Sequence, residues 1–269
     1  MLTAGCDIGA LTTKAAVIRD DVILGSEVVR SRAKAVESAT DVMDRLLGRL
    51  GLTYDRIDYC VSTGYGRNLV SFAHSNMSEI SCHGRGAQWL VPSVRTVIDG
   101  GGQDCKAIRV DERGGLVDFR MNTKCAAGTG KALELMARSL GVEVSELGPL
   151  SLQAKDPVKM NKPCCILTQI DVKRFVFDGR DRADIAAGIN DNVAREILHL
   201  VWDLGVENDI AVTGGAAKNV GLVRCLEQYL GVVSVRFQVD PQLIGAIGAA
   251  VLAADRCRKV VAGQSAAAE

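Results

Sequence analysis

The pattern that most restricts the fold of this chain is a strand–turn–strand sequence that occurs twice. Alternating and β-branched residues predict two sets of three strands, over 2–8, 13–19 and 22–29 and over 95–99, 105–110 and 116–121. Asp7, Gly9 and Lys14 recur as Asp99, Gly101 and Lys106, each 92 positions later and at the same place in the pattern. We interpret this as an internal duplication that gives two lobes of one architecture.

The rest of the chain adds helices to each set of strands. Helical spacing predicts helices over 35–50, 129–140, 166–176, 217–230 and 244–258, and a long helix that ends near Leu204. Further strands are expected over 57–62, 209–213 and 232–239. This order predicts an α/β protein with mixed sheets flanked by helices. We place the lobes at 1–94 and 95–249, with a cleft between them and a last helix over 250–269 that returns to the first lobe.

Composition excludes some classes of partner. The chain has 32 basic and 32 acidic residues, so a role in binding nucleic acid or a membrane surface through bulk charge is not expected. The apolar run over 244–254 is too short to span a bilayer, and no signal-peptide pattern opens the sequence, so we expect a cytoplasmic protein. In that compartment its nine cysteines are expected to be reduced.

Two glycine turns have the character of phosphate-binding loops. The first contains Asp7 and Gly9, followed by Thr12, Thr13 and Lys14. The second consists of Asp99, Gly100, Gly101, Gly102, Gln103 and Asp104. Such turns direct backbone N–H groups toward one point, and a carboxylate there can face a phosphate through Mg²⁺. A single turn of this kind is a weak signal, but the repetition favours a nucleotide triphosphate held with its metal between two loops.

A third glycine turn follows the strand predicted over 209–213. It contains Gly214, Gly215, Ala216, Lys218 and Asn219 at a strand-to-helix junction, where small residues permit close approach of a flat ligand. Small residues also occupy one face of the helix over 244–250. In this order the four segments resemble the phosphate loops, adenosine loop and connecting helix of the superfamily that contains actin, Hsp70 and sugar kinases. The resemblance implies two ribonuclease-H-like lobes with an ATP cleft between them.

The cysteines divide into two groups. Cys6, Cys60, Cys105, Cys225 and Cys257 lie in apolar contexts and are expected to be small buried side chains. Cys125 and Cys164 each precede a helix, where the dipole stabilises a thiolate, and they are 39 residues apart. A 4Fe-4S cluster needs four cysteinates. Two ligands from this chain and two from a symmetric partner would satisfy it, whereas the alternative is simple packing or a redox-inert pair of thiols.

Longer motifs resemble one family within that superfamily. They are K-C-A-A-G-T-G (124–130), S-E-I-S-C-H-G-R-G-A (78–87), T-V-I-D-G-G-G-Q-D (96–104) and T-G-G-A-A-K-N (213–219). Together they look like the BadF/BadG/BcrA/BcrD ATPase family, over about residues 3–253. The family contains ATP-binding subunits of benzoyl-CoA reductase and activators of 2-hydroxyacyl-CoA dehydratases. The resemblance implies a dimeric ATPase with one shared 4Fe-4S cluster, whose ligands fall on Cys125 and Cys164, with Cys165 as an alternative to Cys164.

The segment after the second cysteine departs from the dehydratase activators. Residues 165–171 replace the acidic segment expected there, which favours a benzoyl-CoA reductase subunit paired with a non-identical sister. A homodimeric dehydratase activator is the alternative, and a small-molecule kinase or a regulatory ATP-binding module without a cluster would be further ones. The expected partners are a sister subunit, an acyl-CoA-binding subunit, and ferredoxin or flavodoxin as electron donor. Asp7, Asp99, Gln103 and Asp104 are the candidate catalytic residues, and His83 is expected to be structural.

Overall fold

The computed structural model describes residues 1–122, 128–162 and 164–266, and side chains as far as residue 259. The predicted ligand Cys125 lies outside the described residues. The chain divides into two compact units. Unit 1 comprises Met1–Ser93, Val110–Leu116 and Leu243–Glu269, and unit 2 comprises Val94–Arg109 and Val117–Gln242. The lobes expected over 1–94 and 95–249 stay a prediction.

Unit 1 contains a mixed five-stranded sheet. Its strands are β1 (Leu2–Ile8), β2 (Thr12–Arg19), β3 (Val22–Arg30), β4 (Tyr59–Thr63) and β5 (Ser75–Asn76), in the order β3-β2-β1-β4-β5. The first three strands are antiparallel, whereas β4 and β5 add in parallel. Asp20 and Asp21 connect β2 to β3 with φ angles of 48° and 64°, which suits a two-residue hairpin turn.

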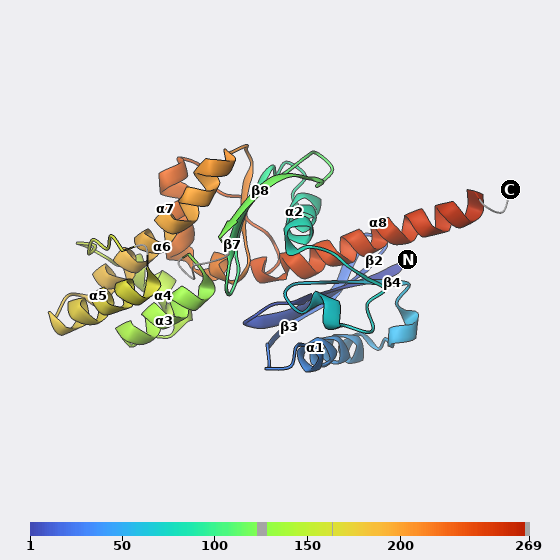
Figure 1. Ribbon diagram of the computed structural model, residues 1–269, viewed down its shortest axis with the longest axis horizontal. Coiled ribbons are helices and arrows are strands. Elements are labelled where there is room, and N and C mark those ends of the chain that lie inside the picture. The colour runs from blue at the N-terminus through green and yellow to red at the C-terminus, as the bar shows by residue number, and fades with distance from the viewer. Residues whose placement is uncertain (123–127, 163, 267–269) are drawn as a thin grey trace. The chain divides into compact units, whose positions relative to one another are not determined.

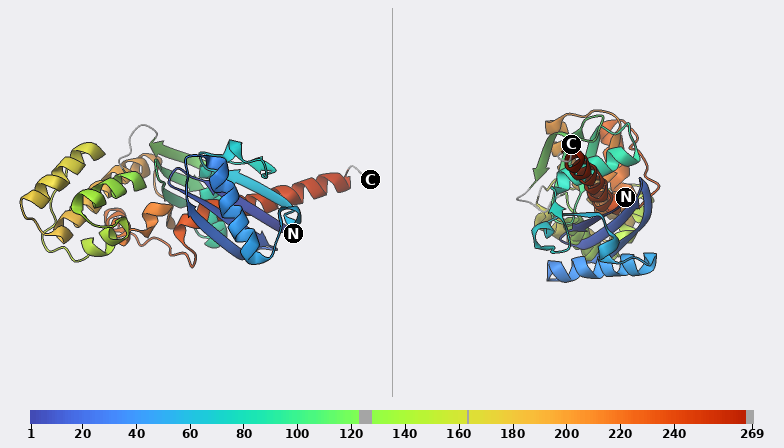
Figure 2. Two further views of the ribbon diagram at one scale, coloured as in Figure 1. Left: turned by 90° about the horizontal axis from the view of Figure 1, so that it is seen from below. Right: turned by 90° about the vertical axis from the view of Figure 1, so that its right-hand side faces the viewer.

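Helices cover both faces of this sheet. Helix α1 (Ala35–Leu50) packs against β1, β2 and β3, and helix α8 (Ile244–Ala266) packs against β1, β2 and β4, on the other side of the sheet from α1 (Figures 1 and 2). Helix α2 (Glu79–Leu90) packs against α8. The backbones approach closely here, since a Cβ placed on Gly5 would lie 2.1 Å from the carbonyl oxygen of Ala246. The small residues of α8 therefore serve this tight packing.

Unit 2 contains a four-stranded sheet. Its strands are β6 (Thr96–Gly100), β7 (Cys105–Val110), β8 (Leu116–Asn122) and β9 (Ile210–Thr213), in the order β8-β7-β6-β9. As in unit 1, the central strand pairs antiparallel with the next strand and parallel with a later one. The register also repeats: Asp7 lies opposite Lys14 and beside Thr63, and Asp99 lies opposite Lys106 and beside Thr213. The expected duplication is therefore confirmed at the level of strand register.

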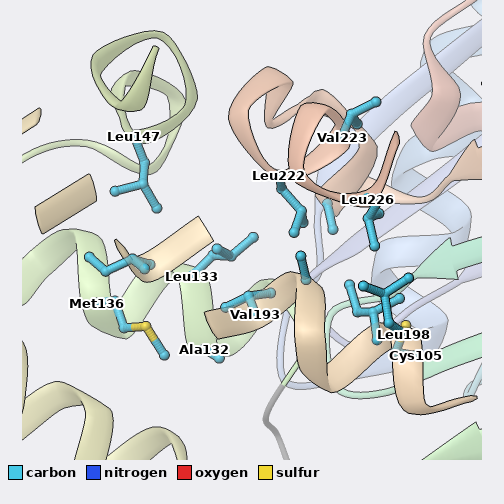
Figure 3. Close-up of a cluster of buried hydrophobic side chains, with 14 of the residues drawn as sticks. Cys105, Ala132, Leu133, Met136, Leu147, Val193, Leu198, Leu222, Val223 and Leu226 are labelled. Carbon is cyan, nitrogen blue, oxygen red and sulfur yellow. The ribbon is translucent and has the colours of Figure 1, made fainter. Parts of the chain in front are cut away.

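The helices of unit 2 share one core. They are α3 (Gly130–Leu140), α4 (Val144–Ser151), α5 (Cys165–Phe177), α6 (Arg182–Leu204) and α7 (Val220–Leu230). Leu133 and Met136 of α3, Leu147 of α4, Val193 of α6 and Leu222 of α7 belong to one buried cluster (Figure 3). At ~1.5–3 kcal/mol for each large side chain removed from water, this cluster supplies much of the stability of unit 2.

Most predicted elements appear within a few residues of their expected ends, but the strand over 232–239 does not form. Its contact with the described part of the sheet is an isolated bridge between Val235 and Ala211. The backbone N–H of Ser234 donates instead to a carboxylate oxygen of Glu227, at 2.9 Å, so the ladder does not extend.

Sequence reasoning also missed α2 and α4, whose glycines and proline weaken the helical pattern. In the described part of the chain, no helix has the length and apolar character needed to cross a bilayer.

Candidate functional site

The first loop, residues 7–14, joins β1 to β2 around a buried ion pair. Asp7 is 3% exposed, and Lys14 Nζ lies 2.9 Å from its Oδ2. The hairpin register causes this pairing, because it places Lys14 directly across from Asp7. Gly9 closes the turn by donating its N–H to the carbonyl oxygen of Thr12, at 3.2 Å, and a Cβ on Gly9 would lie 2.8 Å from that oxygen. The sequence thus builds a tight turn whose two strands are joined by an ion pair between Asp7 and Lys14.

The two threonines of the first loop have different surroundings. Thr13 is fully buried, and its hydroxyl shares a hydrogen bond of 2.9 Å with the hydroxyl of Ser31. Ser31 in turn donates to the carbonyl oxygen of Gly9, at 2.7 Å. Thr12 is half-buried. Thr13 therefore braces the turn from inside, and Ser31 is a supporting residue that sequence reasoning did not identify.

The second loop, residues 99–104, repeats this arrangement with an additional acid. Asp99, Asp104 and Lys106 are each at most 3% exposed. Lys106 Nζ lies 2.6 Å from Asp104 Oδ1 and 3.4 Å from Asp99 Oδ2, so two carboxylates share one ammonium group. Gln103 is exposed. Of the two residues predicted to position water, Asp104 is therefore held by Lys106, whereas Gln103 projects into solvent.

The start of helix α3 is attached to the second loop. The N–H groups of Gly130 and Lys131 donate to the carbonyl oxygens of Gly101 and Gly102, at 2.9 and 3.0 Å. Thr129 caps the helix by accepting from the N–H of Ala132. Gly130 follows Cys125 by five positions. The glycine-rich loop therefore holds the helix that follows Cys125, the first predicted cluster ligand, in the sequence.

The third loop, residues 213–219, lies against the second loop. Gly214 has a φ of +80°, and a Cβ there would lie 2.5 Å from both Asp99 Oδ1 and the carbonyl oxygen of Gly100. Thr213 donates its hydroxyl to Asp99 Oδ1 at 3.3 Å. A Cβ on Gly100 would lie 2.4 Å from the Cβ of Ala216. Only glycine at these positions permits the two loops to approach this closely.

The last two predicted residues of the third loop have structural partners. Lys218 Nζ pairs with Asp240 Oδ2 at 2.7 Å. Asn219 caps helix α7 by accepting from the N–H of Leu222 at 3.0 Å, and its amide donates to Asn190 Oδ1 at 2.8 Å. Gly215 is the open part of the loop, since a Cβ there would find its nearest neighbour, Gln242 Nε2, at 3.5 Å. The 3-10 helix η3 (Gly215–Lys218) is thus held at its C-terminal end by Asn219.

Unit 1 contains a counterpart of the third loop that sequence reasoning did not identify as part of a site. Gly64 has a φ of +88°, and a Cβ there would lie 2.7 Å from Asp7 Oδ1 and 2.5 Å from the carbonyl oxygen of Ile8. The signal was available, because Thr-Gly ends both strands that pair in parallel with an aspartate-bearing strand. Gly245 and His83 lie near the other carboxylate oxygen of Asp7, since a Cβ on Gly245 would lie 3.0 Å from Asp7 Oδ2 and 2.7 Å from His83 Nε2.

The second pair of cysteines lies at the start of α5. Cys164 is the N-cap residue and Cys165 the first residue of the helix, and both are half-buried. Cys165 packs against the core of unit 2. Thr168 donates its hydroxyl to the carbonyl oxygens of Lys162 and Cys164, each at 3.1 Å. Among the residues that the structure describes, no three His, Cys, Asp or Glu side chains gather to hold a metal ion.

The remaining cysteines follow the expectation of packing only in part. Cys6, Cys60 and Cys105 are buried, as is Cys82, but Cys225 and Cys257 are half-buried because they lie on helix surfaces. Burial raises the pKa of Cys60 and of Cys82 to about 12, and that of Cys225 to about 11. These thiols are therefore protonated at neutral pH and are poor metal ligands.

Solved structures of other proteins share this fold. The activator of 2-hydroxyisocaproyl-CoA dehydratase from Clostridium difficile, solved with bound ADPNP, superposes with a TM-score of 0.93 at 36% identity, over 98% of each chain. A glucokinase of the ROK family from Streptomyces griseus superposes with a TM-score of 0.58 at 13% identity, over 95% of this chain and all of that one. The second likeness shows the fold alone, and the expected actin-like and sugar-kinase-like architecture is confirmed.

Curated relatives match along almost the whole chain. The activator of lactoyl-CoA dehydratase from Anaerotignum propionicum is 39% identical over 263 residues, covering 96% of this chain and 100% of the relative. One of the subunits of benzoyl-CoA reductase from Thauera aromatica is 34% identical over 271 residues, covering 96% of this chain and 95% of the relative. The sequence profile of one family matches residues 4–253, as the motifs predicted. The chain belongs to the BadF/BadG/BcrA/BcrD ATPase family.

Proposed function

We propose that this protein is the ATP-dependent activator of a 2-hydroxyacyl-CoA dehydratase, which hydrolyses ATP to deliver an electron to its partner. Sequence reasoning favoured a benzoyl-CoA reductase subunit because of residues 165–171. The relatives support the activator better, since three dehydratase activators are 37–39% identical to this chain and the reductase subunit is 34% identical. Overall identity to the relatives therefore carries more weight in this proposal than the departure over 165–171.

The observation that carries the proposal is the attachment of α3 to the second loop. Hydrogen bonds from Gly130 and Lys131 to Gly101 and Gly102 join a candidate phosphate loop to the start of α3, which Cys125 precedes by five positions in the sequence. A change in the second loop on binding or hydrolysis of a nucleotide would then move the start of α3. A protein that only phosphorylates a small molecule has no need of such a connection to a helix that follows a cysteine in the sequence.

The nucleotide is the substrate for which the three loops are suited. Asp7 and Asp99 are buried carboxylates at the ends of equivalent strands, and each contacts a lysine across a hairpin. Each could hold Mg²⁺ through water, and the metal would neutralise charge on the phosphates. The backbone of Gly9 and of residues 100–102 would face phosphate oxygens, and Gly215 in the third loop would face the adenosine. Asp104 or Gln103 would position the attacking water.

Cys125 and Cys164 would supply one half of a shared 4Fe-4S cluster. Cys164 is the N-cap residue of α5, whereas Cys165 packs against the core of unit 2, so Cys164 is the better second ligand beside Cys125. The cluster would supply a one-electron reductant of low potential. Next to Cys164, helix α5 exposes Ile166, Leu167 and Ile170 at 62%, 47% and 57%, an apolar surface suited to a protein partner. The partners would be a second copy of this chain, a dehydratase bearing the acyl-CoA, and ferredoxin or flavodoxin as donor.

Single substitutions at the three cysteines test the proposal. Protein purified without oxygen should contain iron and sulfide, with visible absorption and, after reduction, a paramagnetic signal. Cys125→Ala and Cys164→Ala should lose these signals, whereas Cys165→Ala, the neighbouring control, should keep them. Wild-type protein that hydrolyses ATP as an iron-free monomer would contradict the proposal and favour a kinase of this fold. A cluster that forms only with a non-identical sister chain would favour the reductase subunit.

A further inference from the structure

A chain of buried polar side chains joins helices α4, α6 and α7 inside unit 2. It consists of Ser151, Asn190 and Asn219, which are 9%, 0% and 7% exposed. Asn190 Nδ2 donates to Ser151 Oγ at 2.9 Å, and Asn190 Oδ1 accepts from Asn219 Nδ2 at 2.8 Å. Both ends of the chain are anchored on backbone, because Ser151 donates to the carbonyl oxygen of Gly148 at 2.7 Å and Asn219 accepts from the N–H of Leu222 at 3.0 Å.

Two glycines bring the helices close around this chain. A Cβ on Gly221 of α7 would lie 2.0 Å from Ser151 Oγ and 2.4 Å from Asn190 Nδ2. A Cβ on Gly148 of α4 would lie 2.7 Å from Asn219 Oδ1. These distances show that the helices meet here in direct contact. Within this contact the side-chain amide of Asn219 is held by Asn190.

Asn219 controls the exit of the third loop. It follows η3 directly and is the N-cap of α7, so its side chain determines where the loop ends and the helix begins. The entry of the loop is held separately, by the N–H of Gly214, which donates to the carbonyl oxygen of Pro241 at 3.0 Å, and by the contact of Thr213 with Asp99. A shift of Asn219 should thus displace Ala217 and Lys218 at the exit of the loop, while Gly214 and Ala216, which lie against Asp99 and Gly100, stay in place.

We propose that Asn190 is the positioning residue of the third loop and thereby sets the affinity for the adenosine part of ATP. The inference rests on the proposed function, in which this loop faces adenosine. The side chain of Asn190 is hydrogen-bonded to Ser151 and Asn219, which lie outside the two phosphate loops. It acts through Asn219, and its removal should weaken nucleotide binding without slowing hydrolysis once ATP is bound.

The substitution Asn190→Leu keeps the number and branching of the side-chain heavy atoms and removes both hydrogen bonds. It leaves Ser151 Oγ without its donor and the amide of Asn219 without its acceptor in a buried place. Leaving buried polar groups unsatisfied is enough to move an equilibrium by about tenfold. We therefore expect KM for ATP to rise about tenfold with kcat within about twofold of the wild-type value, a split that indicates lost ground-state binding. A general loss of folded protein would instead lower kcat and leave KM unchanged.

The same helix offers a matched control. Asn192 is 3% exposed, but its amide donates to the carbonyl oxygen of Lys162 at 3.1 Å, away from the third loop. Asn192→Leu should leave KM for ATP within about twofold of wild type. Ser151→Ala removes only the far end of the chain and should raise KM about threefold, which provides a milder variant if Asn190→Leu does not fold.

The steady-state ATPase assay with Mg²⁺, at saturating and limiting ATP, distinguishes the outcomes. An unchanged KM in folded Asn190→Leu, or in Ser151→Ala if the former does not fold, would overturn the inference, as would an equal rise in Asn192→Leu. Failure of wild-type protein to bind or hydrolyse ATP would overturn the proposed function itself. A wild-type ATPase whose KM is insensitive to these changes would refute the positioning role alone.

Discussion

Replacing Gly214 with alanine should disturb the second loop as well as the stability of unit 2. The residue has φ +80° and ψ −178°, a region that is essentially restricted to glycine and costs other residues ~1–3 kcal/mol. The new Cβ would lie 2.5 Å from Asp99 Oδ1 and from the carbonyl oxygen of Gly100. Relieving such overpacking costs a further ~1–3 kcal/mol, so the total loss of unfolding free energy is about 2–6 kcal/mol.

Gly231→Ala is the matched control for backbone strain. Gly231 caps α7 with φ +67°, and a Cβ there would meet no atom within 4 Å. Its loss should be only about 1–2 kcal/mol, because an alanine in the left-handed region carries the strain without a clash. The difference between the two variants in urea unfolding therefore measures the close approach of the third loop to the second.

The same pair of variants separates stability from activity. To reach even a 3.0 Å contact, Asp99 and Gly100 must move by about 0.5 Å, and displacements of this order cost roughly tenfold or more in the rate of a positioned reaction. Gly214→Ala should lower kcat for ATP hydrolysis at least about tenfold under conditions where the protein is folded, whereas Gly231→Ala should not. Equal stability losses with unchanged kcat in both variants would refute the close contact between Gly214 and Asp99.

Two further predictions concern buried charge and buried thiols. Lys106→Met leaves two buried carboxylates without their shared lysine and should lower the unfolding free energy, measured by urea denaturation, by about 3–5 kcal/mol. Lys14→Met leaves one such carboxylate and should cause a smaller loss. Equal losses in the two variants would contradict this account. Burial raises the pKa of Cys60 and Cys82 from 9.0 to about 12, so the folded state prefers the protonated thiols. Their contribution to stability is therefore present below pH 9 and is lost as the pH rises toward 12. The unfolding free energy should therefore fall less steeply with pH from 9 to 12 in a Cys60→Ala, Cys82→Ala double variant; parallel curves would show that these thiols do not titrate as described.

The sequence by itself determined the two hairpins and the Asp–Lys ion pair in each of them. Side chains alternate with a period of two along a strand, so the spacing of Asp7 to Lys14 and of Asp99 to Lys106 fixes which residues face each other once the turn is placed. The helix ends were equally local, as when Thr129 and Gly141 begin and end α3. These features depend on residues only a few positions apart, and a single chain segment encodes them.

Other features were decided only when distant segments packed together. The segment expected as a strand over 232–239 meets β9 in an isolated bridge between Val235 and Ala211, which are 24 positions apart. The loops at Asp99 and Gly214 approach across 115 positions of sequence, and Asn190 reaches Ser151 and Asn219 across 39 and 29. The periodicity of a single segment does not predict such contacts. They depend on which faces of the helices pack into the core and on the glycines that let two backbones approach. The sequence thus determines the candidate phosphate loops, and the tertiary structure determines what holds them in place.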